Sequence, residues 1–292
     1  MSAAPAARAF DVPPARAAEF AFEHRDHVAI AEIVYADSGI LLPDGKMQLV
    51  YGRLAKRLRI RGLTRFSEYV ALLGTDPAER IEAIDALTTN HTKFFREDHH
   101  FDHFRDTVWP GLTRRLETGG RVRMWSAACS SGEEPYTLAM TMLGRDKANA
   151  TRLGRQDCQI LATDLSPTIL DQARAGTYPA SVSQGVPADL RNLWLVRRGD
   201  LVEVHPACKA LVAYRPLNLL RDWPMKQMFD VIFCRNVMIY FDEPTKATLQ
   251  ARLADQLAPG GHLYIGHSER LSPSVAPRFE SIGRTMYRKL GA

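Results

Sequence analysis

Four polar clusters follow apolar runs after residue 120, and each holds side chains that could bind a ligand. The first runs from Ser126 to Glu134 and is a turn of small residues that ends in two acids. Small side chains let a ligand approach the backbone closely. The turn lacks G-x-G-x-x-G, and acids at a helix start disfavour phosphate, so a dinucleotide is not expected. The acids suit a cationic ligand, although they could simply complement the helix dipole.

The second and third clusters contain side chains typical of a nucleoside site. Asp164 comes directly after the apolar run Gln159–Thr163, where an acid commonly holds a ribose diol. It could instead cap the helix that follows. Asn218 could recognise an adenine edge through its side-chain amide, or it could be a turn residue.

The fourth cluster, Arg235 and Asn236 with Tyr240, follows the apolar run Phe229–Cys234. Each of these residues could also be ordinary surface. Ligands of an open parallel sheet bind beyond the carboxyl ends of its strands. If the apolar runs are parallel strands, the four clusters meet at one edge of the sheet.

A further polar and aromatic segment, Thr88–Glu97, lies upstream and could belong to the site or form a packed interdomain hinge. It is followed by His99, His100 and His103, which raise the alternative of a metal site. These histidines lie on one predicted helix start, whereas metal ligands normally come from more than one element. No metal is therefore expected.

The elements that must position these side chains change in type near residue 115. Before it, apolar periodicity and capping residues predict helices over Asp26–Ala36, Asp44–Arg61, Ser67–Leu73 and Pro77 to about Leu87. After it, apolar runs alternate with helical patterns, which predicts an α/β fold with a mainly parallel sheet covered on both faces.

The strands are predicted at short apolar runs. They are Val122–Ala127, Gln159–Thr163, Phe229–Cys234, His262–Gly266 and a final strand over Ser281–Leu290. Leu201–Val204 and Leu211–Tyr214 interrupt the alternation, and we expect them to be short antiparallel strands of an inserted subdomain at about residues 179–215.

Composition excludes several classes of protein. The 292 residues are 46% hydrophobic and 24% charged, which is typical of a globular chain. No apolar stretch is long enough to span a membrane. The four scattered cysteines argue against a zinc cluster or a disulfide framework and suit a reducing cytosol. Residues 1–20 are rich in Ala, Pro and Arg, which favours a disordered tail, with a transit peptide as the alternative.

A basic stripe marks the second predicted helix. Residues 46 to 65 hold seven Lys or Arg and no acid. Helical spacing places Lys46, Arg53, Arg57 and Arg61 beside one another, with Lys56 at the edge. We expect this stripe to face outward and to meet an acidic partner, with a solvated face as the alternative. Few aromatic residues interleave with the charges, so nucleic acid is not favoured.

Six stretches, in order, closely resemble the CheR-type chemotaxis receptor methyltransferases. They are TTNHTKFFRE (88–97), WSAACSSGEEPYTLAM (125–140), ATDLSPTILDQARAGTY (162–178), PLNLL (216–220), FDVIFCRNVMIYFD (229–242) and GGHLYIGHSERL (260–271). The resemblance implies a sheet of the S-adenosylmethionine-dependent, Rossmann-like methyltransferase type, with a small all-α N-terminal domain and a small antiparallel β insertion. The implied domains are a helical one over 21–88, a cofactor-contacting linker over 89–115 and a methyltransferase domain over 116–292.

The resemblance also implies an activity. The family transfers a methyl group from S-adenosylmethionine, leaving S-adenosylhomocysteine, to specific glutamates on the cytoplasmic helical bundle of chemoreceptors. Arg96 and Tyr240 would be catalytic. The implied cofactor contacts are Asn90, Thr92, Arg96, Glu134, Asp164, Asn218, Leu219, Arg235 and Asn236. The acidic partner of Lys46, Arg53, Lys56, Arg57 and Arg61 would then be the receptor. We expect a cytoplasmic monomer that neither enters a membrane nor binds nucleic acid.

Two features depart from the family pattern. Cys129 stands in a turn where Ala is familiar, which could make the site sensitive to oxidation. The insertion has only the short turn Arg197–Asp200, whereas members that dock on a receptor's C-terminal tail have a longer loop. We therefore expect independence from the tail. Two alternatives to this activity are a non-catalytic nucleoside-binding regulator and a methyltransferase acting on RNA or a small molecule.

Overall fold

The computed structural model describes residues 19–88 and 91–291. Nearly all of the predicted N-terminal tail lies outside this part. Glu19 and Phe20, which we assigned to the tail, instead contact the helical bundle. Phe20 is buried, and its backbone N–H donates to the Tyr51 hydroxyl at 3.1 Å. None of the described helices is both long and apolar enough to cross a membrane.

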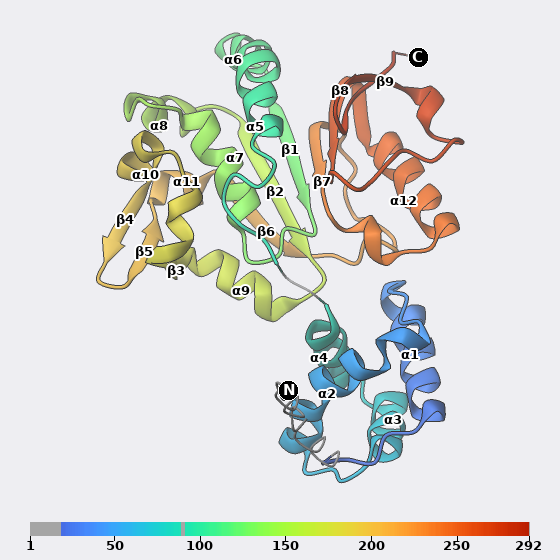
Figure 1. Ribbon diagram of the computed structural model, residues 1–292. Helices are drawn as coiled ribbons and strands as arrows, with labels where there is room; N and C mark the ends of the chain where they lie inside the picture. The colour runs from blue at the N-terminus through green and yellow to red at the C-terminus, as the bar shows by residue number, and fades with distance from the viewer. Residues whose placement is uncertain (1–18, 89–90, 292) are drawn as a thin grey trace, which may run out of the picture.

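The four predicted N-terminal helices are present and gather in a bundle below the sheet in Figure 1. They are α1 (His24–Ser38), α2 (Met47–Arg61), α3 (Phe66–Thr75) and α4 (Pro77–Leu87), with a short helix η1 (Asp44–Lys46) leading into α2. Glycines at 39 and 62 end α1 and α2 in the left-handed conformation. The side chain of Asp76 caps α4 by accepting hydrogen bonds from the amides of Ala78 and Glu79, as predicted.

Glu79 is fully buried between α2, α3 and α4, where several donors surround its carboxylate. Arg57 donates to both of its oxygens at 2.8 and 2.6 Å, Arg61 donates at 2.6 Å, and the Tyr69 hydroxyl donates at 2.7 Å. Burial alone would raise the pKa of Glu79, but hydrogen bonds from Arg57, Tyr69 and Arg61 outweigh it and lower the pKa to about 2.

The expectation that the basic stripe faces outward is wrong for its centre. The guanidinium of Arg53 donates to the backbone carbonyls of Leu87 and Thr88 at 2.6 and 2.8 Å, and the side chain of Arg57 is only 15% exposed. Both arginines turn toward α4. Arg53 reaches the carbonyls at its C-terminal end, and Arg57 reaches its acids. The periodicity of α2 alone could not predict these partners, because they lie on another helix. Lys46 and Lys56 remain exposed.

A seven-stranded sheet forms the larger part of the molecule, in the order β6-β2-β1-β7-β8-β10-β9. The first five strands in this order are parallel, and β10 pairs antiparallel with β8 on one side and with β9 on the other. Their bounds are β1 Val122–Ala127, β2 Cys158–Asp164, β6 Val212–Pro216, β7 Phe229–Cys234, β8 Leu257–Ile265, β9 Phe279–Gly283 and β10 Met286–Lys289.

Two strand predictions are corrected. In the run Leu211–Tyr214, residues 212–214 belong not to the insertion but to β6, which pairs in parallel with β2. A four-residue apolar run does not specify its partner or its direction. The single final strand predicted over Ser281–Leu290 is instead the hairpin β9–β10. The small antiparallel sheet of the insertion consists of β3 (Thr177–Pro179), β4 (Leu195–Arg198) and β5 (Leu201–Val204), in the order β3-β5-β4.

Helices cover both faces of the large sheet. Met124 of β1 packs into a cluster with side chains of α5 (His99–His103) and α7 (Glu133–Leu143), whereas Trp125 packs on the opposite face with α12 (Glu243–Gln256). This alternation follows the two-residue period of a strand. The second cluster continues into the helical bundle, so one apolar core joins the bundle to the sheet.

The remaining helices lie along the large sheet or in the insertion. They are η2 (Phe104–Val108), α6 (Trp109–Glu117), α8 (Ala148–Leu153), α9 (Pro167–Ala175), η3 (Ala180–Gly185), α10 (Ala188–Trp194), α11 (Pro206–Ala210), η4 (Met238–Tyr240) and η5 (Ala276–Arg278).

Replacing Glu79→Gln should lower the free energy of unfolding by about 3 kcal/mol, because it leaves Arg57 without its buried partner. The pKa of Glu79 is lowered on folding, so its contribution is complete above about pH 4.5 and disappears as the pH falls toward 2. Denaturant unfolding of both proteins across this range measures the effect.

Glu82→Gln is the matched control. Glu82 accepts from the same Arg57 at 2.9 Å but is 44% exposed, so its loss should cost under about 1 kcal/mol. Equal losses of unfolding free energy in the two variants would show that the stabilisation does not depend on the burial of Glu79.

Candidate active site

A cavity lies beyond the carboxyl ends of β1, β2, β6 and β7, with Thr88, residues 91–96 and the end of α1 closing it from the other side. Every predicted cofactor-binding or catalytic residue in the described part of the chain lines it. These residues are Thr92, Arg96, Glu134, Asp164, Asn218, Leu219, Arg235, Asn236 and Tyr240. Asn90 lies outside the described residues. The parallel topology thus brings together the clusters that the sequence leaves apart.

The small-residue turn after β1 is tied to the end of β2. The backbone N–H of Ser130 donates to Asp164 Oδ2 at 2.8 Å, and that of Cys129 donates to the Thr163 carbonyl at 2.9 Å. Gly132 has φ 95°, and a Cβ there would lie 2.9 Å from the Tyr214 hydroxyl oxygen, so only glycine fits.

Cys129 is buried in this turn rather than presented to solvent. Burial, and then the carboxylates of Asp164 and Glu134, raise the pKa of its thiol well above the usual value. Since the thiolate is the form that oxidants attack, a raised pKa disfavours the oxidation that the sequence suggested.

Asp164 and Asn218 line the same cavity wall, but their side chains differ in the hydrogen bonds that they already make within the protein. Asp164 accepts from the backbone amides of Ser130 and Ser166, and burial raises the pKa of its carboxyl group. Carboxylate oxygens have further lone pairs, so Asp164 can still accept from a ligand. Asn218 donates to the Asp37 carbonyl at 2.7 Å and accepts from the Leu220 amide at 2.9 Å, which are the bonds of a turn residue.

Arg235 is the most deeply buried charge in the cavity wall, with a side chain 2% exposed. Its Nη1 donates to Glu134 Oε2 at 3.0 Å, and its Nη2 donates to the backbone carbonyl of Arg96. Its Nη2 also lies 3.6 Å from Glu97 Oε2. Arg235 therefore joins the end of β7 to the start of α7 and to the segment that precedes α5.

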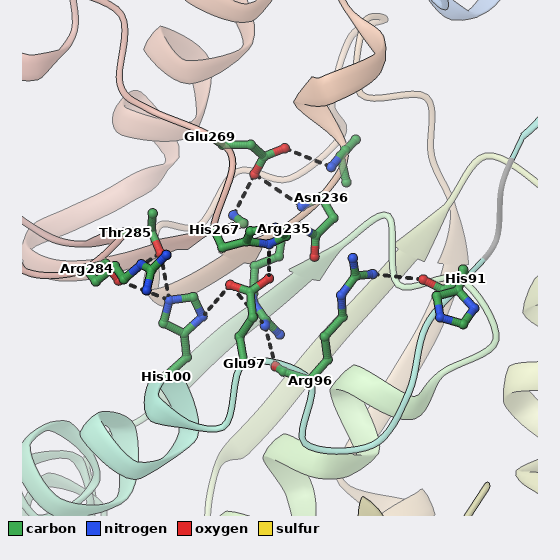
Figure 2. Close-up of polar contacts among 12 residues, drawn as sticks. His91, Arg96, Glu97, His100, Arg235, Asn236, His267, Glu269, Arg284 and Thr285 are labelled. Atoms are coloured by element: carbon green, nitrogen blue, oxygen red, sulfur yellow. Dashed lines mark hydrogen bonds and ion pairs between the residues drawn. The ribbon is translucent and has the colours of Figure 1, made fainter.

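Glu97 is a part of this cluster to which the sequence reasoning assigned no role. Figure 2 shows its carboxylate between Arg235, His267 and His100. Its Oε1 lies 3.1 Å from His267 Nδ1, and the residue is held at φ 56°. Burial alone would raise the pKa of Glu97, but Arg235 and His267 outweigh it and lower the pKa. Only its position next to Arg96 could have pointed to it.

Glu97 also belongs to a group with the spacing of metal ligands. Ligand atoms of Glu97, His99 and His100 lie within 4.8 Å of one another, so this group differs from the three histidines that the sequence raised as an alternative. His103 instead faces the Tyr264 hydroxyl at 2.9 Å. The guanidinium of Arg235 already lies against the Glu97 oxygen, and its charge disfavours a second cation there.

Glu269 holds the turn that carries Asn236, and it too was missed. Its oxygens accept from the backbone amides of Gly266, Asn236, Val237 and Met238 at 2.6 to 3.2 Å. These bonds hold the backbone of Asn236 at φ 59°, a conformation that residues other than glycine adopt uncommonly. Burial raises the pKa of Glu269 despite the four donors.

The fold and this cavity define an α/β protein that binds a nucleoside cofactor at the carboxyl ends of its strands. Comparison with known proteins is more specific. The profile of the CheR methyltransferase SAM-binding domain matches residues 90–288, and that of the CheR all-alpha domain matches residues 26–88.

Three chemotaxis protein methyltransferases are similar in sequence to most of this chain. A probable chemotaxis protein methyltransferase from Rhizobium etli is 47% identical over 88% of this chain and 96% of its own length. Chemotaxis protein methyltransferase 2 of Pseudomonas aeruginosa is 39% identical over 92% of this chain and 94% of its own. The chemotaxis protein methyltransferase of Escherichia coli is 39% identical over 88% of each.

The chain belongs to the CheR methyltransferase family. It is an enzyme that uses S-adenosylmethionine to methylate chemoreceptors in chemotactic adaptation. The predicted fold class, cofactor and activity are confirmed.

Glu269→Gln should lower the free energy of unfolding by about 1–3 kcal/mol, because an amide cannot satisfy the four backbone donors that the carboxylate accepts. It should also weaken S-adenosylmethionine binding several-fold, since the Asn236 turn forms part of the cavity wall. Denaturant unfolding and calorimetry measure the two effects.

Glu280→Gln is the control, because Glu280 is 48% exposed and bonds only to Arg288 among the described residues. If the Glu269 variant bound the cofactor as tightly as the control does, the turn would not depend on this carboxylate.

Proposed function

We propose that the acceptors are specific glutamate side chains on the cytoplasmic helical bundle of chemoreceptors, which become methyl esters. A glutamate is already ionised at neutral pH, so no general base is needed. The observation that carries the proposal is that the cavity wall combines acids with an arginine and a tyrosine, Arg96 and Tyr240. Such a wall suits a cationic methyl donor and a carboxylate acceptor.

The residues present fit S-adenosylmethionine. Asp164 ends β2 with accepting capacity to spare and would hold the ribose hydroxyls. Glu134 would face the positively charged end, and Leu219 with Leu165 offers an apolar wall for the base. Thr92, Asn218, Asn236 and Asn90 would complete the contacts. When bound, the cofactor supplies a methyl group on a sulfonium and leaves as S-adenosylhomocysteine.

Arg96 and Tyr240 would orient the acceptor carboxylate. The Nη1 of Arg96 donates to the His91 carbonyl at 2.8 Å, which holds the guanidinium at the cavity wall. Among the described residues, the Tyr240 hydroxyl has no hydrogen-bond partner, so it can donate to a substrate. An arginine that fully neutralised the carboxylate would weaken it as a nucleophile, so we assign orientation to Arg96. Catalysis then consists of positioning and desolvation.

Tyr240→Phe should lower the rate of methyl transfer at saturating receptor about tenfold to a hundredfold, through loss of one hydrogen bond to a charged group. Arg96→Ala should lower it further. Both should unfold at nearly the wild-type denaturant concentration. The assay is incorporation of labelled methyl groups into a receptor fragment.

Tyr287→Phe is the matched control, since Tyr287 is half-buried in β10 away from the cavity. A Tyr240→Phe enzyme with the full rate would remove the hydroxyl from the mechanism. Transfer to RNA in place of the receptor fragment would overturn the proposed substrate.

We place the receptor contact on the basic surface formed by the end of η1 and by α2. Its exposed members are Lys46, Lys56 and Arg61, whereas Arg53 and Arg57 support the surface through their bonds to α4. Exposed charges mainly steer encounter and set register, so their effect depends on salt.

Reversing Lys46→Glu together with Lys56→Glu should raise the receptor concentration for half-maximal rate several-fold at low salt, with a smaller effect at high salt. Cofactor affinity should not change, because neither lysine lines the cavity. A salt series on both proteins measures this.

Lys147→Glu with Lys226→Glu makes the same charge change on exposed lysines outside the helical bundle. If this control pair raised the half-maximal concentration equally, net charge rather than a docking surface would be responsible.

We further propose a cytoplasmic monomer that works without a receptor tail peptide. Only two residues, Gly199 and Asp200, connect β4 to β5, which supports independence from the tail. The four cysteines are free thiols, in keeping with a reducing compartment.

A further inference from the structure

We propose that Glu97 is a positioning residue for the cationic cofactor, acting through Arg235 on Glu134. By sharing the charge of the Arg235 guanidinium, Glu97 leaves the Glu134 carboxylate available to S-adenosylmethionine. The inference rests on the proposed placement of the cofactor against Glu134. Glu97 itself does not line the cavity, so its effect must pass through its neighbours.

The contacts show a guanidinium between two carboxylates. Arg235 lies 3.0 Å from Glu134 Oε2 on one side and 3.6 Å from Glu97 Oε2 on the other. Both acids are nearly buried, with side chains 13% and 11% exposed, so solvent screens these charges little. The charge of Arg235 is therefore divided between them.

Apart from Arg235, the described side chains that contact the Glu97 carboxylate are two histidines, which cannot supply a negative charge in its place. His100, whose Nδ1 lies 3.8 Å from Glu97 Oε2, is fully buried. Burial lowers the pKa of His100 to about 3, so its ring is neutral at physiological pH. On the other side, His267 approaches the second oxygen of Glu97 at 3.1 Å and helps to fix the carboxylate toward Arg235.

The two forms of the cofactor provide a test of this charge balance. S-adenosylmethionine carries a sulfonium and S-adenosylhomocysteine a neutral thioether, so they differ by one positive charge. Removing the charge of Glu97 makes the cavity wall more positive by one unit. A charge change at a buried site discriminates between these ligands, whereas a loss of shape weakens both.

The experiment is calorimetric titration of wild-type protein and Glu97→Gln with each ligand. We expect S-adenosylmethionine affinity to fall about tenfold and S-adenosylhomocysteine affinity to fall by no more than about threefold. Glu97→Asp keeps the charge and should keep the wild-type ratio of the two affinities. Glu243→Gln removes the same charge from a side chain that is 80% exposed and should change neither affinity.

The ratio of affinities decides the outcome. Equal losses for both ligands in Glu97→Gln, or no loss, would overturn the proposal. So would a changed ratio in Glu97→Asp, which serves as the test if the glutamine variant does not fold. Glu134→Gln tests the placement of the cofactor against Glu134 separately from the role of Glu97. Unchanged S-adenosylmethionine affinity in this variant would overturn the placement itself.

Discussion

Burial of one positive charge organises the active site. A guanidinium with only 2% of its side chain exposed is strongly destabilising unless several acceptors surround it. For Arg235 these are the carboxylates of Glu134 and Glu97 and the backbone carbonyl of Arg96. They come from the start of α7 and from the segment after the helical bundle. Satisfying this charge therefore fixes two separate segments against the end of β7, and Arg96 is placed at the cavity as a consequence.

The same region holds most of the backbone strain in the described part of the chain. Phe95, Glu97, Ala128, Ser130 and Asn236 all have φ between 51° and 59°, and each lies in or beside a segment that frames the cavity. Such conformations persist only where surrounding contacts determine them. Glu269 supplies those contacts for Asn236, and Asp164 supplies one for Ser130. The site is preorganised by groups whose own side chains need not touch the reacting atoms.

The helical bundle shows how similar charges serve different purposes. Arg57 and Arg61 of α2 hold Glu79 inside the bundle, whereas Lys56 on the same helix and Lys46 at the end of η1 stay in solvent. The bundle in turn joins the site directly, because the Leu41 amide donates to the Tyr240 carbonyl at 3.0 Å and Asn218 donates to the Asp37 carbonyl. Any movement of the bundle toward a receptor would act on residues that line the cavity.

The sequence by itself determined the local elements and the family. Apolar periodicity and capping residues placed α1, α3 and α4 to within two residues, and six ordered motifs identified the methyltransferase fold and its cofactor. Only the tertiary structure decided which side chains meet. It assigned Val212–Pro216 to the large sheet, turned Arg53 and Arg57 inward, and gave Glu97, His267 and Glu269 their roles. The physical reason is that periodicity specifies which face of an element is apolar, whereas strand direction and charge pairing depend on elements distant in the sequence.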